Sequence, residues 1–196
     1  MTSSYRNFEE LKEREIEGRD YRIRINLKEG PVLIMAPHGG KIEPGTAEIA
    51  EAIAGNDYSF YSFEGLKVDR SSNLHIESHL FDEPQALKAV ERVDIVITVH
   101  GQLNQKDGFI MIGGLNDRLC SEIKRQLEAA GFQTRPPTKG LEGIDPMNIC
   151  NRGRLKSGIQ LEISRKIRDS LRTNRNQLQP FADAVRRAIQ FYLSSK

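Results

Sequence analysis

Three predominantly apolar runs constrain the fold of this chain more than any other feature. They are VLIMA at 32–36, VDIVITV at 93–99 and FIMIGG at 109–114. Strands that are apolar on both faces are typical of the buried middle of a sheet that helices cover on both sides. Helical patterns alternate with these runs, which predicts one α/β domain over residues 1–196, with a mixed, largely parallel open sheet flanked by helices.

The other segments supply the outer strands, the helices and a long loop. Pro37 is expected to end the first apolar strand, because proline cannot donate to a strand ladder. The segment 135–153 is rich in proline and glycine, and loops of this length are usually functional. Further strands are expected at 21–27 (half-exposed, near a sheet edge), 58–65 and 158–164, and helices at 7–17, 46–54, 84–92, 116–130 and 180–194.

Bulk composition is that of an ordinary globular protein, with 29% charged and 38% hydrophobic residues and a net charge of +2. The N-terminal stretch lacks the apolar core of a signal peptide, and no apolar run approaches the ~20 residues of a membrane span. We therefore expect a chain made in the cytoplasm, without a membrane partner and monomeric. Release by lysis of a host cell, to act outside it, and a housekeeping role in the cytoplasm both fit this expectation.

Two histidines stand directly after buried strands. His38 follows VLIMAP, His100 follows IVITV, and a glycine comes after each. The carboxyl ends of neighbouring parallel strands share one edge of a sheet, so both imidazoles are expected at the same place. Glu43 stands five residues after His38 in a glycine- and proline-rich turn. A histidine can simply end a strand, but two in equivalent positions favour a functional site.

Two imidazoles and one carboxylate form the ligand set of a hydrolytic zinc site. The fourth position is left to a water molecule, whose pKa zinc lowers to about 7. Magnesium and calcium prefer oxygen ligands and fit less well. The two cysteines, Cys120 and Cys150, lie far apart without CxxC spacing, so neither a disulfide framework nor a cysteine zinc site is expected.

Glu162 is the best candidate for the general base. It lies on the polar face of the alternating strand GIQLEIS, with Gln160 and Ser164 on the same face. A carboxylate on a rigid strand can be held close to a water molecule, take its proton and pass that proton to the leaving amine. The alternative is an edge strand whose polar face meets solvent.

Four strings, HGGKIEPGT, NLHIESHLFDEP, DIVITVHG and GIQLEIS, resemble in sequence and order the phage and Bacillus poly-γ-glutamate hydrolases. The resemblance implies a zinc-dependent amidase of carboxypeptidase A-like, phosphorylase/hydrolase-like fold. It also implies the ligands His38, Glu43 and His100 and the base Glu162. One departure concerns the wider carboxypeptidase pattern, in which the first histidine and the glutamate are three residues apart rather than five.

The substrate of that family carries one free carboxylate per unit, so arginines are expected around the site. We assign Arg152 to catalysis and His75 to a contact with substrate or transition state. The arginine that stabilises the oxyanion is expected to be one of Arg70, Arg152, Arg154 and Arg165, and the sequence leaves the choice among them open. The helical arginines from Arg168 to Arg175 are expected to stay solvated. The candidates for binding substrate carboxylates are Arg70, Arg154 and Arg165.

Several other functions were weighed. An α/β-hydrolase esterase would need a GxSxG nucleophile elbow, which is absent. A phosphate-binding module would use the glycine turn before helix 46–54, but the turn has neither GxxxxGK[ST] nor GxGxxG. A nucleic-acid binder would place aromatic residues in the basic segment 152–175, and none is there. The main alternative is a zinc deacylase or carboxypeptidase acting on small N-acyl acidic amino acids.

The sequence is compatible with cleavage inside the polymer or from its end, and with D- or L-glutamate. It is equally compatible with a phage or a bacterial origin.

Overall fold

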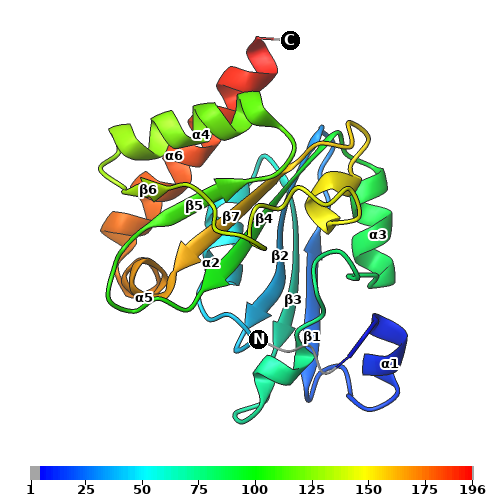
Figure 1. Cartoon of the computed structure of the whole chain (residues 1–196). Coiled ribbons are helices and arrows are strands. Elements are labelled where there is room, and N and C mark those ends of the chain that lie inside the picture. The colour runs from blue at the N-terminus through cyan, green and yellow to red at the C-terminus, as the bar shows by residue number, and fades with distance from the viewer. Residues whose placement is uncertain (1–4, 196) are drawn as a thin grey trace.

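A seven-stranded mixed sheet organises the computed structural model, which describes residues 5–195 (Figure 1). β3, β2, β4 and β7 run parallel through its centre, and β1 pairs antiparallel with β3 at one edge. At the other side β5 pairs antiparallel with β7 and parallel with β6. The strands are β1 (Tyr21–Asn26), β2 (Val32–Gly40), β3 (Ser59–Gly65), β4 (Ile95–Gln102), β5 (Ile110–Gly113), β6 (Thr134–Arg135) and β7 (Ile159–Ser164).

Helices cover both faces of this sheet. One hydrophobic core joins it to α2 (Thr46–Ala54), α4 (Asp117–Ala129), α5 (Arg165–Thr173) and α6 (Arg175–Ser194). A second core, on the opposite face, joins it to α1 (Phe8–Lys12), α3 (Pro84–Glu91) and the short 3₁₀ helices η1 (Ser71–Leu74) and η2 (Ile149–Arg152). The predicted α/β fold with a mixed, largely parallel sheet is confirmed.

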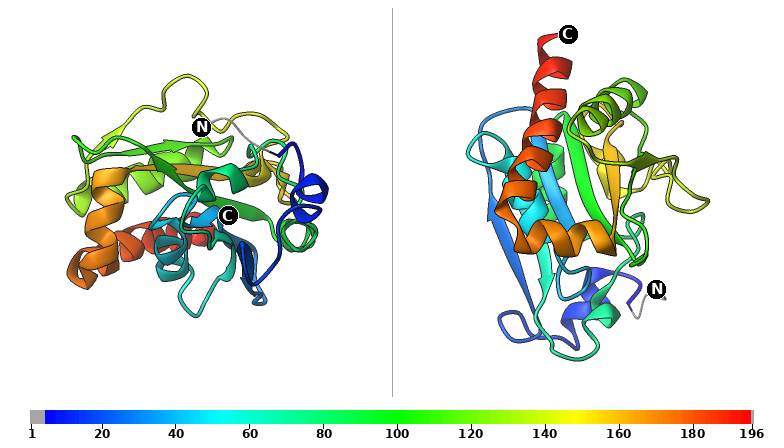
Figure 2. Two further views of the ribbon diagram at one scale, coloured as in Figure 1. Left: turned by 90° about the horizontal axis from the view of Figure 1, so that it is seen from below. Right: turned by 90° about the vertical axis from the view of Figure 1, so that its left-hand side faces the viewer.

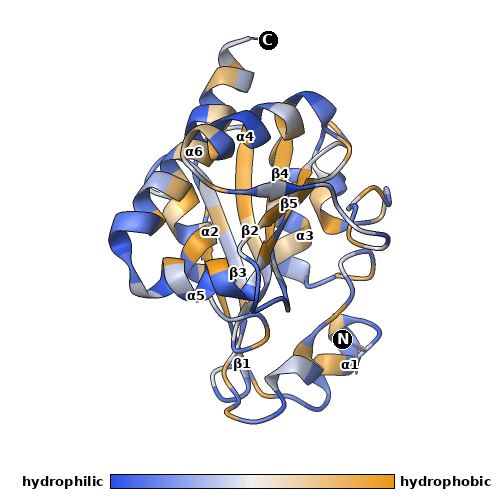
Figure 3. Ribbon diagram, turned by 60° about the vertical axis from the view of Figure 1, so that its left-hand side comes forward, coloured by the Kyte–Doolittle hydropathy of each residue, from blue (hydrophilic) through white to orange (hydrophobic). Residues whose placement is uncertain are grey.

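The apolar runs are explained by these two cores. Within β2, Ile34 belongs to the first core, whereas its neighbours Leu33 and Met35 belong to the second. Successive side chains of a strand point to opposite faces, so a strand covered on both sides must be apolar at nearly every position. Figure 3 shows the resulting apolar centre of the sheet beneath helices with hydrophilic outer surfaces.

One sequence prediction about the strands is wrong. β2 continues through Pro37 to Gly40, because a register shift between Ala36 and Gly39 accommodates the missing N–H group. The arginines after β7 were expected to be helical and solvated. They lie on α5 and at the start of α6, where Arg172 and Arg175 are exposed and Arg168 is buried. The predicted edge strand at 21–27 is confirmed as β1.

The loop 136–148 lies on the side of the sheet opposite α5 and α6, as both views of Figure 2 show in yellow-green. It belongs to the long loop predicted from its proline and glycine content, and its residues 140–145 line a pocket beside the ends of the central strands. Even the 20-residue α6 lacks an apolar run that could cross a bilayer, and this holds for every helix in residues 5–195.

Candidate metal centre

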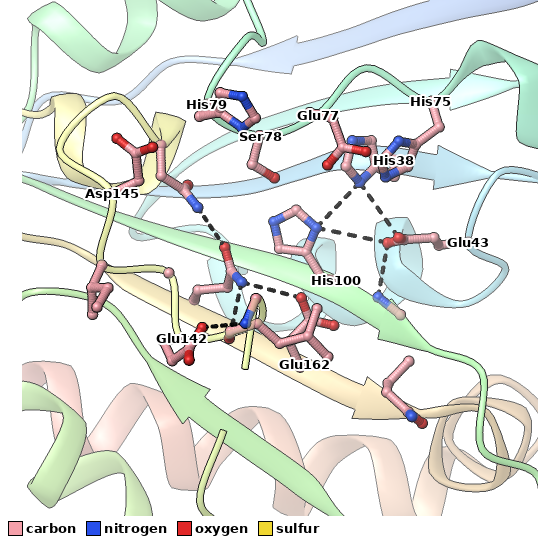
Figure 4. A pocket seen from close by; sticks show the side chains of 18 of the residues that line it. His38, Glu43, His75, Glu77, Ser78, His79, His100, Glu142, Asp145 and Glu162 are labelled. Atoms are coloured by element: carbon pink, nitrogen blue, oxygen red, sulfur yellow. Dashed lines mark hydrogen bonds and ion pairs between the residues drawn. The ribbon is translucent and has the colours of Figure 1, made fainter. Parts of the chain in front are cut away.

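The central parallel strands bring three of the predicted residues together. His38 lies near the end of β2 and His100 near the end of the adjacent β4, while Glu43 follows in the turn after β2. All three side chains are buried and line a pocket of about 520 Å³ (Figure 4). The two histidines were predicted to lie at the same edge of the sheet, and they do.

Four potential ligand atoms from three side chains converge at this place. His38 Nδ1 lies 3.2 Å from His100 Nδ1 and 3.4 Å from Glu43 Oε1, and His100 Nδ1 lies 3.8 Å from Glu43 Oε2. Ligands about 2.0–2.1 Å from one tetrahedral zinc ion are about 3.3 Å apart. The spacing of the three side chains therefore suits a shared ion.

The turn after His38 explains how a spacing of five residues can work. The Glu43 N–H donates to the carbonyl of His38 at 2.9 Å, which folds the turn back on itself. Gly40 has φ +62°, and a Cβ there would lie 2.5 Å from the carbonyl oxygen of Gly65. Glycine is needed at that position because a side chain would be both strained and obstructed. Glu43 is then held from the other side by the Gly101 N–H, 2.8 Å from Oε2.

The two imidazoles differ in what holds them in place. His38 Nε2 lies 2.7 Å from the carbonyl of Ile76, which fixes the proton on Nε2 and leaves the Nδ1 lone pair facing Glu43 and His100. Burial, and then the neighbouring His38, holds the pKa of His100 well below its usual value, so this ring is neutral. Its Nδ1 faces His38 and Glu43, while its Nε2 is buried without a hydrogen-bond partner in residues 5–195, so His100 lacks the backbone contact that orients His38.

His75 also lies at the centre. Its ring packs on that of His38 with centroids 3.9 Å apart, and burial lowers the pKa of His75 to about 3. His75, His38 and Glu43 each offer a ligand atom within 4.8 Å of the others, so a second ligand set is available. In the set with His100, the atoms of different side chains lie 3.2–3.8 Å apart, measured to one or the other oxygen of Glu43.

Glu162 projects into the same pocket from β7, where it is paired in register with His100 of β4. All six residues of β7 are buried, so the alternative of a solvent-facing edge strand is excluded. Gln160, two residues earlier on the same face, donates from Nε2 to Glu162 Oε1 at 3.1 Å and accepts from Asn148 Nδ2 at 2.8 Å. This chain of amides fixes one carboxylate oxygen. Neither amide was singled out beforehand as a positioning residue, although Gln160 stands at i−2 from Glu162.

The acidity of Glu162 leads to a prediction for the metal-free protein. Burial, and then the charge of Glu43, raises the pKa of Glu162 well above the 4.5 of an exposed glutamate. Between these two pKa values the folded state holds a proton that the unfolded state has released, so stability falls as pH rises. We expect Glu162→Gln to melt at a higher temperature than the wild type at pH 8, with a smaller difference at pH 5. A difference independent of pH, in thermal melts with chelator present, would contradict this assignment.

The four predicted arginines lie elsewhere. Arg152 donates to the carbonyl of Phe81 at 3.1 Å, Arg154 pairs with Asp94 at 2.9 Å, Arg165 pairs with Asp169 at 2.7 Å, and Arg70 is exposed before η1. Within the described chain, the pocket lining contains no arginine or lysine. The arginines expected around the site are therefore absent from the pocket lining, and Arg152, Arg154 and Arg165 bind acceptors outside it.

Acidic residues take that place in the lining. Glu77, Glu142 and Asp145 join Glu43 and Glu162 around the pocket, and the exposed His79 lies across it from Glu43 (Figure 4). The predicted solvation of Arg168 is also wrong, since this side chain is only 1% exposed. A signal was present in the sequence: Arg168 stands three residues before Leu171, on the buried side of α5.

Comparison with known proteins identifies the family. Residues 5–188 match the family model described as poly-gamma-glutamate hydrolase. The chain belongs to the poly-gamma-glutamate hydrolase family. The predicted resemblance is thereby confirmed.

Individual relatives agree with this family. The SPbeta prophage-derived protein YoqZ of Bacillus subtilis is 41% identical over 162 residues, which is 82% of this chain and 58% of YoqZ. The structure of a bacteriophage poly-gamma-glutamate hydrolase is similar over 100% of both chains, with a TM-score of 0.95 and 29% identity. A zinc-free structure of YndL is similar over 96% of this chain and 98% of the other, with a TM-score of 0.90 and 35% identity. The chain thus spans a little over half the length of YoqZ.

Proposed function

We propose that this chain is a single zinc hydrolase domain that cleaves the γ-glutamyl amide bonds of poly-γ-glutamate. The observation that carries the proposal is the convergence of His38, Glu43 and His100 within 3.2–3.8 Å, beside a buried carboxylate on the next strand. Membership of the family supports the substrate. The description of YndL as zinc-free supports the metal.

The proposed ligands are His38 Nδ1, His100 Nδ1 and the Glu43 carboxylate. Their chemistry fits zinc, since two neutral imidazoles and one carboxylate leave a position open. Zinc bound there would supply Lewis-acid chemistry, by polarising a carbonyl and lowering the pKa of a water molecule to about 7. The hydrogen bonds of His38 Nε2 to Ile76 and of Glu43 to Gly101 hold two of the ligands in place beforehand.

Glu162 is the proposed proton carrier. It takes a proton from the attacking water and delivers it to the amine nitrogen as the amide bond breaks. Gln160 holds Oε1, which directs the other carboxylate oxygen to the substrate side. The charge of zinc, when bound by the three ligands, would favour the ionised form of Glu162. Glu162 must be ionised to act as a base. His75, a neutral ring in the pocket lining, is the proposed contact to the scissile carbonyl.

The lining indicates how the polymer would lie. Because the lining has five acidic residues and, within residues 5–195, no arginine or lysine, the free carboxylates of the substrate are expected to point towards solvent. Two apolar side chains at the pocket, Leu103 and Ile144, are 61% and 58% exposed and suit the methylene groups of the polymer backbone. The scissile amide can therefore enter the pocket without an arginine there to bind the substrate carboxylates.

The test is incubation of the purified chain with poly-γ-glutamate, with product sizes followed by gel filtration. We expect the polymer to shorten with zinc, to remain intact with chelator, and to shorten again when zinc is restored. Poly-α-glutamate, which has the same charge but ordinary peptide bonds, is the matched control and should remain intact. Cleavage of small N-acyl glutamates with no change in the polymer would contradict the proposal and favour the deacylase alternative.

A further inference from the structure

Arg168 of α5 is a buried cation whose hydrogen bonds all go to backbone carbonyls. Nε donates to Ile163 at 3.0 Å, Nη1 to Pro44 at 2.6 Å and Nη2 to Gln102 at 3.2 Å. A guanidinium group has its donors in a fixed planar fork, so one side chain can bind three separate segments. A surface arginine would not bury its charge in this way, because desolvation is costly unless the partners are well placed.

The three carbonyls belong to the three segments that carry the proposed chemistry. Pro44 follows the proposed ligand Glu43, Gln102 lies two residues after His100, and Ile163 follows Glu162. We propose that Arg168 is the positioning residue that fixes these segments relative to one another. An effect of Arg168 on catalysis rests on the proposed function. Its effect on the relative positions of the three segments does not.

Gly101 connects Arg168 to Glu43. A Cβ at Gly101 would lie 2.5 Å from Arg168 Cζ and within 2.8 Å of both terminal nitrogens, so the guanidinium lies directly against this glycine. The N–H of Gly101 is the one that donates to Glu43 Oε2. The position of Arg168 thus determines where that N–H points, and glycine is needed there because any side chain would displace the guanidinium.

Charge gives Arg168 a second contribution. The pocket lining of the described chain has five acidic residues and no arginine or lysine, so Arg168 is a cation placed behind the lining rather than in it. Its charge lowers the pKa of Glu162 against the larger effect of burial. The positive charge of Arg168 is in turn favoured by Glu43. Removing Arg168 would leave two buried carboxylates without this compensation.

Arg186 provides a matched control. Its Nη1 donates to the carbonyls of Ile53 at 2.9 Å and Ala54 at 3.0 Å, at the end of α2, and its guanidinium also pairs with Asp57. It therefore bridges segments through backbone carbonyls as Arg168 does, but at a place outside the pocket lining. Arg186→Gln should lower the melting temperature without changing the site.

The experiment measures hydrogen exchange of the Gly101 amide by NMR in metal-free Arg168→Gln, Arg168→Lys, Arg186→Gln and wild type, and zinc affinity in the same four proteins. We expect Gly101 to exchange at least about tenfold faster in both Arg168 variants, because neither glutamine nor lysine has donors on three separate nitrogens that could reach all three carbonyls. Zinc affinity should fall about 10–100-fold, the usual effect of losing a contact that orients a ligand. Arg186→Gln should match the wild type in both measurements.

Wild-type exchange at Gly101 in either Arg168 variant would overturn the proposal, and so would equal acceleration in Arg186→Gln, which would indicate general destabilisation. If Arg168→Gln does not fold, Arg168→Lys carries the test alone, since it retains the charge. The exchange measurement needs neither zinc nor polymer. A wild type that neither binds zinc nor cleaves poly-γ-glutamate would refute the proposed function and leave this inference to be judged by exchange.

Discussion

Glu162→Gln is expected to lower turnover of poly-γ-glutamate by about 10³-fold, because a positioned general base contributes about 10²–10⁴-fold. An amide of nearly the same shape keeps the hydrogen-bond position of Gln160 but cannot accept a proton from water. The variant should still bind about one equivalent of zinc, since Glu162 is not among the proposed ligands. Steady-state rates and zinc content, both measured on the same preparation, provide the check.

Glu142→Gln is the matched control for this variant. Glu142 is another carboxylate of the pocket lining, but it lies on the loop 136–148 and accepts a hydrogen bond from the backbone N–H of Gly140. Its loss should leave turnover within a few-fold of the wild type. Equal losses in the two variants would show that overall pocket charge, rather than a base on β7, controls the rate.

His38→Ala and His100→Ala should each lose zinc and activity together. Removal of a ligand is expected to weaken zinc binding more than the about 10–100-fold caused by losing a contact behind a ligand. Both side chains are buried, so the variants also lose packing, and their folding should be confirmed by circular dichroism. Zinc titration followed by elemental analysis after dialysis gives the affinity and the stoichiometry.

The other two histidines of the pocket serve as controls. His79 is exposed on the far side of the pocket, so His79→Ala should retain zinc and most activity. His75→Ala should retain zinc, because His75 packs on His38 but is not among the proposed ligands, and it should lose turnover, because its ring is the proposed contact with substrate. Loss of zinc in His75→Ala together with full retention in His100→Ala would reverse the choice between the two ligand sets.

The positions of the proposed ligands could be predicted because they follow from local pattern. A strand covered on both faces must be apolar, so the first polar residue after such a run marks the edge of the sheet. This placed His38 and His100 correctly, and the alternation in β7 placed Glu162 on the face of Gln160. The turn after His38 folds back and brings Glu43 close to the two histidines. This folding depends on the glycines of the turn and not only on the five-residue spacing between His38 and Glu43.

The arginines could not be placed in the same way. Their long side chains bind whichever acceptor is near in space, and sequence position does not reveal it. Arg152 and Arg154 follow the loop that reaches the pocket, yet they bind Phe81 and Asp94. The burial of Arg168 was not predicted because α5 carries many charged residues, and such a helix is usually solvated. The carbonyl partners of Arg168 come from segments that meet only in the folded sheet.

The central claim is that His38, Glu43 and His100 hold one zinc ion. The most direct measurement is a crystal structure of the zinc-loaded protein with anomalous data collected on both sides of the zinc absorption edge. We predict one strong peak about 2.0–2.2 Å from His38 Nδ1, His100 Nδ1 and a Glu43 oxygen. A peak bound by His75 in place of His100, or no peak among these side chains at saturating zinc, would contradict the account.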